Sequence, residues 1–147
     1  PDDAYFIMRG IRTLDVRLDK HHQNAKQIAK FLSTKKNIEV LYPLKKNTKN
    51  YKLWNKYYSG SSGLMGIKIT AKNKKSVDKF VNSLKLFGHG YSWGGYESLA
   101  LHQEIKEQGK RKFLKLKKNE HIVRLHIGLE DPKDLIQDLR KSLKFIK

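Results

Sequence analysis

The sequence predicts an α/β (α+β) sandwich, in which a long N-terminal helix is followed by a small, mostly antiparallel sheet with helices packed on it. Segments with the apolar spacing of a helix alternate along the chain with segments that have the spacing of a strand. The chain has no internal repeat. Its 147 residues include 38% hydrophobic positions and no cysteine, so one core can form without a disulfide or a cysteine-ligated zinc ion.

The N-terminal part is predicted to form one long amphipathic helix over residues 4–32. Its apolar residues recur at helical spacing, and only Gly10 interrupts the pattern. These residues are Ile7, Ile11, Leu14, Leu18, Ala25, Ile28 and Leu32. We therefore expect residues 1–34 to form a connecting helix and residues 35–147 to form a small domain.

Two strands are predicted after this helix. Residues 38–42 form a short apolar run that ends at a proline, and residues 65–70 alternate apolar and polar or small positions. Residues 44–58 mix lysine, asparagine and aromatic residues, with one helical turn expected around Trp54. The sequence GSSG at 60–63 favours a turn before the second strand.

A second helix and a long irregular stretch come next. The helix is predicted from an apolar stripe made of Val77, Phe80, Val81, Leu84 and Phe87. The glycine-rich residues 88–98 cannot form a regular helix. Residues 103–120 carry many lysines and few apolar positions, which indicates an exposed connection.

The C-terminal part is predicted to be a strand and a helix. Val123, Leu125 and Ile127 alternate with other residues, so Arg124 should lie on the opposite face of the strand from these aliphatic side chains. Asp131 can cap a helix that has proline at its first position. The buried stripe of this helix is expected to be Leu135, Ile136, Leu139, Leu143 and Ile146.

The chain is strongly basic, with 32 Lys and Arg residues against 14 Asp and Glu, a net charge of +18. Only 6 of these cations are Arg, the residue that reads nucleic acid by bidentate contacts, and the lysines are spread over every segment. A solvated basic surface is therefore favoured over nucleic-acid binding, although the basic and aromatic residues 45–58 could stack bases in principle. Binding of a polyanion through this surface stays the alternative.

Other classes of function find little support in the sequence. The six histidines lack the spacing of metal ligands, and no phosphate-binding glycine loop or nucleophile elbow is present. No apolar run approaches the length of a membrane span, and the first residues do not have the order of a signal peptide. We therefore expect no metal site, no membrane contact and a cytoplasmic location.

Two features could carry chemistry. Arg124 interrupts an aliphatic strand and must reach a carboxylate, a phosphate or solvent, because an unpaired buried guanidinium is very costly. An arginine exposed at a sheet edge is the alternative. In the segment YSWGGYESL, 91–99, the side chains of Tyr91, Ser92, Trp93 and Tyr96 could bind a polar ligand, or the aromatic rings could fold into the core.

Four segments together resemble a known family. They are RGIRTLDVRLDKHHQNA at 9–25, YYSGSSGLMGIKI at 57–69, YSWGGYESL at 91–99 and VRLHIGLEDPKDLIQDL at 123–139. In this order they resemble the C-terminal small domain of the cystathionine β-lyases, fold type I enzymes of the pyridoxal-phosphate-dependent Cys/Met metabolism family. Trp93 is typical of the β-lyase branch, whereas cystathionine γ-synthase and γ-lyase relatives usually carry an aliphatic residue there.

The resemblance implies a set of residue roles. Arg124 matches the residue that binds the α-carboxylate of the amino-acid substrate, Ser92 and Trp93 match residues that line the substrate site, and Tyr91 adjoins them. The implied reaction is the α,β-elimination of cystathionine to homocysteine, pyruvate and ammonia, by an enzyme that is a homotetramer. The implied cofactor is pyridoxal 5'-phosphate, and its attachment lysine and binding groups belong to an N-terminal domain with no counterpart in this sequence.

This resemblance predicts no catalytic and no cofactor-binding residue in the chain, and no lyase activity for the chain alone. Two alternatives stay open: a γ-synthase or γ-lyase type of enzyme, and a non-catalytic relic domain that binds polyanions. The lysine-rich connection at 100–120 and the GHG at 88–90 depart from the family pattern.

Overall fold

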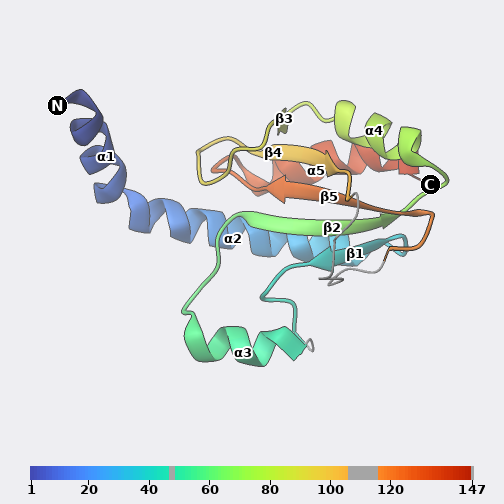
Figure 1. Cartoon of the computed structure of the whole chain (residues 1–147), viewed down its shortest axis with the longest axis horizontal. Coiled ribbons are helices and arrows are strands. Elements are labelled where there is room, and N and C mark those ends of the chain that lie inside the picture. Colours follow the sequence, from blue (N-terminus) through green and yellow to red (C-terminus); the bar gives the residue numbers. More distant parts are fainter. Residues whose placement is uncertain (47–48, 106–115, 147) are drawn as a thin grey trace.

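The computed structural model describes residues 1–46, 49–105 and 116–146 (Figure 1). The helices are α1 (Asp2–Arg12), α2 (Leu14–Ser33), α3 (Lys49–Tyr57), α4 (Lys74–Asn82), α5 (Pro132–Ser142) and the short 3-10 helix η1 (Leu143–Ile146). The strands are β1 (Ile38–Leu41), β2 (Leu64–Thr70), β3 (Gly88–His89), β4 (Leu99–Gln103) and β5 (Glu120–His126).

The five strands form one sheet in the order β1-β2-β5-β4-β3. The pairs β1–β2, β2–β5 and β4–β5 are antiparallel, and the two-residue edge strand β3 runs parallel to β4. In the central pair, Met65 lies opposite Leu125 and Ile67 lies opposite Val123. The predicted mixed fold with a mostly antiparallel sheet is confirmed.

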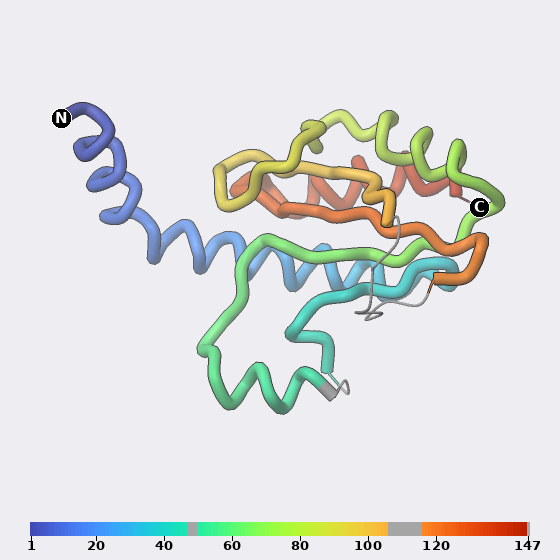
Figure 2. The backbone as a smooth tube through the Cα atoms, in the orientation of Figure 1, coloured from blue at the N-terminus to red at the C-terminus, as the bar shows by residue number. Residues whose placement is uncertain are grey.

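One face of the sheet, called the core face here, is covered by helices. Figures 1 and 2 show α2 and α5 behind the sheet, with α4 beside them. The core face of β5 carries Val123 and Leu125, followed by Ile127 just past the strand, and all three are fully buried. They pack with residues of α2, α4 and α5, including Ile28, Leu32, Val77, Phe80, Leu135 and Leu139. Burial of these aliphatic and aromatic side chains is the main source of stability.

The other face, called the loop face here, carries Ile122, Arg124 and His126 of β5, because side chains alternate along a strand. The segment of residues 90–96, called the 90–96 loop below, contacts this face. The placement of Arg124 opposite the three aliphatic residues confirms the prediction made from the alternation.

The long N-terminal helix is interrupted, so the prediction of one helix over 4–32 is wrong. Thr13 separates α1 from α2 with φ −110° and ψ 8°. The carbonyl of Gly10 accepts hydrogen bonds from Arg17 Nη2 at 2.6 Å and from the Thr13 hydroxyl at 3.4 Å. These side-chain donors compete with the helical amide bond at this point. Figure 2 shows the resulting bend in the tube.

The apolar stripe of this N-terminal part is buried only in its second half. No residue of α1 is buried, and Ile7 and Ile11 are each 63% exposed. In α2, burial begins at His21 and continues through Ile28 and Leu32. The helical spacing therefore identified an apolar face correctly, but packing against the sheet covers only part of it.

The helix predicted from the stripe Val77 to Phe87 ends early. Helix α4 stops at Asn82, while Leu84 and Phe87 remain buried beyond it. The carboxylate of Asp138 on α5 accepts hydrogen bonds from the amides of Lys85 at 2.9 Å and Leu86 at 2.8 Å. This contact replaces the continuing helical bonds with a tertiary one.

The remaining elements agree with the prediction in part. The Asp131 side chain caps α5 by accepting from the Lys133 amide at 2.7 Å, as predicted, and η1 continues the predicted buried stripe to Ile146. Helix α3 is longer than the single turn expected around Trp54. Strand β4 was not predicted. Of the predicted connection 103–120, residues 106–115 lie outside the described residues.

Candidate functional site

Arg124 extends from the middle of the sheet to the 90–96 loop. Its neighbours on the adjacent strands are Gly66 of β2, which has no side chain, and Leu101 of β4. Its guanidinium Nη2 donates to the carbonyl of Gly90 at 3.0 Å and to the carbonyl of Ser92 at 3.3 Å. Both bonds leave from the same nitrogen, so they orient the guanidinium plane without using Nε or Nη1.

The side chains around this guanidinium face outward. The Tyr91 ring centroid lies 6.0 Å from Arg124 Cζ, within the range of a cation–π contact. Tyr91 is 73% exposed and Trp93 66% exposed, and Ser92 and Tyr96 are exposed as well. The alternative in which these aromatic rings fold into the core is therefore wrong. The structure brings the four predicted residues, Tyr91, Ser92, Trp93 and Arg124, to one surface.

The far end of the loop is held by His126, which sequence reasoning did not single out as a site residue. The amide of Gly94 donates to His126 Nε2 at 3.1 Å, and the carbonyl of Gly95 lies 3.2 Å from the same nitrogen. Gly94 has φ +82°, a conformation that favours glycine. The signal in the sequence was the two-residue spacing of Arg124 and His126, which places both on one face of the strand.

The base of the loop is closed by a buried polar cluster. The amide and hydroxyl of Ser98 donate to the two carboxylate oxygens of Glu130 at 2.7 and 2.8 Å, and the Gly128 amide donates to the Ser98 hydroxyl at 2.8 Å. A Cβ at Gly128 would lie 2.3 Å from the Tyr96 carbonyl oxygen. Only glycine lets the two segments approach this closely.

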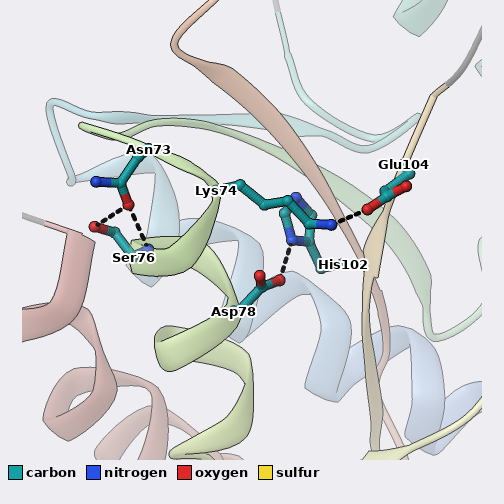
Figure 3. A network of polar contacts seen from close by, with 6 residues as sticks. All are labelled: Asn73, Lys74, Ser76, Asp78, His102 and Glu104. Carbon is teal, nitrogen blue, oxygen red and sulfur yellow. Dashed lines mark hydrogen bonds and ion pairs between the residues drawn. The ribbon is translucent and has the colours of Figure 1, made fainter.

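A second polar network joins α4 to β4 and the residues after it (Figure 3). The carboxylate of Asp78 lies 2.6 Å from His102 Nδ1, and Lys74 pairs with Glu104. Burial lowers the pKa of the neighbouring His121, whose ring is 5.4 Å from that of His102. Among the described residues, no three His, Cys, Asp or Glu side chains come close enough together to hold a metal ion.

The aromatic residues of the basic segment 45–58 pack partly on one another. The Trp54 ring stacks on that of Tyr58 with centroids 4.2 Å apart, and the indole nitrogen donates to the carbonyl of Gly60 at 2.9 Å. A stacked pair whose indole is already hydrogen-bonded presents less ring surface for bases. The Tyr57 and Tyr58 side chains are nonetheless 64% and 59% exposed, so these rings lie at the surface and do not pack inside the fold.

The described residues do not fit a covalently held pyridoxal phosphate. Such a group needs a lysine with a desolvated amine, and no lysine whose side chain is described is buried. Lys68, on the loop face of β2, forms ion pairs with Glu39 at 2.8 Å and Glu120 at 3.5 Å. The guanidinium of Arg124, beside exposed Ser92, fits a ligand carboxylate instead.

Within the described ranges, no helix is both long and apolar enough to cross a membrane.

The sequence of the chain was compared with those of known proteins. The model of the Cys/Met metabolism PLP-dependent enzymes matches residues 1–144. The chain is 38% identical to the cystathionine beta-lyase of Bordetella avium over 97% of its own length, and it spans 36% of the length of that relative.

Solved structures have the same fold. A cystathionine gamma synthase from Xanthomonas oryzae pv. oryzae, in complex with aminoacrylate and cysteine, superposes with a TM-score of 0.83 at 29% identity, over 99% of this chain and 38% of its own. A Campylobacter jejuni structure that carries N'-pyridoxyl-lysine-5'-monophosphate superposes with a TM-score of 0.81 at 31% identity, over 98% of this chain and 32% of its own. The chain therefore belongs to the Cys/Met metabolism family of PLP-dependent enzymes.

Proposed function

We propose that this chain supplies the substrate-carboxylate site of a pyridoxal-phosphate-dependent carbon–sulfur lyase, and that the substrate is cystathionine. The reaction is an α,β-elimination that gives homocysteine, pyruvate and ammonia. The observation that carries the proposal is the Arg124 guanidinium, which is oriented by two loop carbonyls beside the exposed side chains of Ser92 and Trp93. The 38% identity to a cystathionine beta-lyase supports this substrate class.

The role of Arg124 is to bind and orient. A guanidinium binds a carboxylate through charged N–H donors in a fixed plane, which fixes direction as well as charge. The two loop carbonyls accept from Nη2, so the N–H donors of Nε and Nη1 remain for the substrate carboxylate. Ser92 offers a hydroxyl to the same carboxylate. Trp93 provides an apolar wall next to it, and Tyr91 covers the guanidinium from the side.

The cofactor supplies the electron sink for the carbanion at Cα. The described residues of this chain do not fit its covalent attachment, so we assign its attachment lysine to an N-terminal cofactor domain. Residues 1–34 are proposed to connect that domain to the small domain of residues 35–147. The assembled enzyme is proposed to be a homotetramer in the cytoplasm, as the family resemblance implies.

A γ-type enzyme is the second candidate, because the chain also superposes on a cystathionine gamma synthase. Trp93 favours the β-lyase, because the resemblance gives tryptophan at this position in the β-lyase branch and an aliphatic residue in the γ-type relatives. Polyanion binding through the basic surface is the third candidate, supported by the net charge of +18. Such binding would weaken steeply with salt.

The test uses the chain fused to the N-terminal part of the Bordetella avium cystathionine beta-lyase. We expect the fusion to release pyruvate from cystathionine, and Arg124→Ala to lower kcat/KM by about 30-fold or more. The matched control is Arg140→Ala, which removes an exposed arginine on α5. The proposal fails if the fusion binds cofactor but eliminates nothing, or if both variants match the unsubstituted fusion. Release of α-ketobutyrate instead of pyruvate would identify the γ-type enzyme.

A further inference from the structure

Strand β5 holds the 90–96 loop at both ends with side chains from one face. Arg124 donates to the carbonyls of Gly90 and Ser92, and His126 meets the backbone of Gly94 and Gly95. Ser92 belongs to the first attachment, and Trp93 lies between the two. Their side chains are exposed, so hydrogen bonds to the loop backbone, and not core packing, must set their positions.

The side chain of His126 is buried in the fold. It is 2% exposed, and its ring centroid lies 5.0 Å from that of the buried His21 on α2. Its Nδ1 is buried and has no hydrogen-bond partner among the described residues. Leaving the buried imidazole without its hydrogen bond to the loop would cost free energy of folding, because few other partners are near.

The neighbouring groups indicate which nitrogen carries the proton. His21 Nδ1 lies 2.7 Å from the carbonyl of Ile127, which can only accept, so His21 is protonated at Nδ1 and its Nε2 is an acceptor. Two backbone groups face His126 Nε2: the Gly94 amide at 3.1 Å, which can only donate, and the Gly95 carbonyl at 3.2 Å, which can only accept. The Gly94 contact is the shorter, so we assign Nε2 as its acceptor, with the proton on Nδ1. Of the two buried nitrogens without a partner, His126 Nδ1 is then a donor and His21 Nε2 an acceptor.

We propose that His126 is a positioning residue for the substrate site: as the neutral tautomer protonated at Nδ1, it accepts the Gly94 amide at Nε2 and so fixes Ser92 and Trp93 above Arg124. It touches no substrate. The inference deepens the proposed function, and its link to the substrate rests on that function, whereas the tautomer and the loop contact do not.

Burial and several neighbouring groups act on the pKa of His126. Burial lowers its pKa below the ordinary value, and the positive charge of Arg124 and the neighbouring His21 act in the same direction. The Gly95 carbonyl and Glu130 oppose this shift. Arg17 of α2 also reaches the loop, with its Nη1 3.5 Å from the Gly94 carbonyl. A protonated ring would present N–H to the Gly94 amide and lose the contact.

The test is NMR of the full 147-residue chain labelled with ¹⁵N. Long-range ¹H–¹⁵N spectra at pH 7.5 should place the His126 proton on Nδ1, which requires no variant. In His126→Ala, the solvent-exchange rate of the Gly94 amide should rise about five- to tenfold, as expected for the loss of one hydrogen bond. His126→Gln should restore most of the protection, because its side chain also offers an acceptor. His89→Ala, which removes an exposed histidine of β3, should change nothing.

A proton on Nε2 in the unsubstituted chain, or an unchanged Gly94 exchange rate in His126→Ala, would overturn the inference. In the fused enzyme, His126→Ala should raise KM more than it lowers kcat, with His126→Gln close to the original. If the fusion has no lyase activity, the proposed function fails while the NMR result still stands. If the fusion is active and the NMR result is as expected, an unchanged KM in His126→Ala would contradict the positioning role alone.

Discussion

The two faces of strand β5 make different kinds of contact, although their residues alternate along the same seven positions. The core face carries fully buried Val123 and Leu125, which contact helices through apolar atoms alone. The loop face carries Arg124 and His126, which hold the 90–96 loop by hydrogen bonds to its backbone. The strand thus connects the exposed 90–96 loop, which carries the proposed binding residues, directly to the buried core.

On β5, Val123 and Leu125 stabilise the core, whereas Arg124 and His126 position the proposed binding residues. Core-face substitutions remove apolar contacts that nothing replaces. Loop-face substitutions release a surface segment whose backbone can bond to water. Substitutions on the two faces should therefore differ in how much they lower the free energy of unfolding.

The largest effect is expected for Leu125→Ala on the core face. The lost apolar contacts and the cavity should lower the free energy of unfolding by about 2–5 kcal/mol. Urea denaturation followed by circular dichroism measures it. Leu101→Ala on β4 is the matched control, because Leu101 lies beside Arg124 on the loop face and is only half-buried. Equal losses in the two variants would break the contrast.

A smaller effect is expected for Glu130→Gln at the base of the loop. Both carboxylate oxygens accept hydrogen bonds from Ser98, and an amide group can accept only one of them. The free energy of unfolding should fall by about 1–3 kcal/mol. Glu97→Gln, at an exposed neighbouring carboxylate, serves as the control and should be neutral. A Glu130→Gln variant as stable as its control would show that the cluster does not close the loop.

Arg124→Ala should cost about 1 kcal/mol or less in the same denaturation experiment. The Gly90 and Ser92 carbonyls that it releases can be hydrated, because the loop lies at the surface. This result would separate its role in binding from any role in the fold. A loss as large as that of Leu125→Ala would instead make Arg124 a structural residue.

The smallest effect is a pH dependence from His126. Its pKa in the folded chain lies below the value of an unfolded histidine because of burial, so the unfolded state binds the proton more readily. The stabilisation that this neutral ring provides is present above about pH 6.5 and is lost as the pH falls through the folded pKa. The stability difference between the original chain and His126→Gln should therefore shrink from pH 7.5 to pH 5. A difference that grows on acidification has the wrong sign for this account.

Much of this site could be predicted from the sequence, because successive side chains of a strand point to opposite faces whatever the rest of the fold is. The alternation of Val123, Leu125 and Ile127 was enough to place Arg124 on the other face. The helix cap at Asp131 could also be predicted from the sequence, because the hydrogen bond that forms it spans only two residues. The family resemblance added the roles of Ser92 and Trp93, which spacing alone left open between a ligand site and a core turn.

The features that were missed depend on contacts between distant residues. Strand β4, LALHQ, pairs with β5 across a long connection and has too few residues for a clear alternation. The early end of α4 depends on Asp138, more than fifty residues away. At the interruption, the Arg17 and Thr13 side chains both donate to the Gly10 carbonyl, in competition with the helical amide bond. His126 was passed over because its partners, Gly94 and Gly95, come next to it only in the folded chain.

Binding of the substrate α-carboxylate by Arg124 can be tested in one kinetic comparison. In the fused enzyme, kcat/KM is measured for cystathionine and for an analogue in which the α-carboxylate of the three-carbon half, the half that becomes pyruvate, is a carboxamide. Both substrates are measured with and without Arg124→Ala. We predict that the unsubstituted fusion prefers the carboxylate by about 30-fold or more and that Arg124→Ala reduces this preference to near unity. A variant that still discriminates as strongly as the original would show that another group recognises the carboxylate, and would contradict the account.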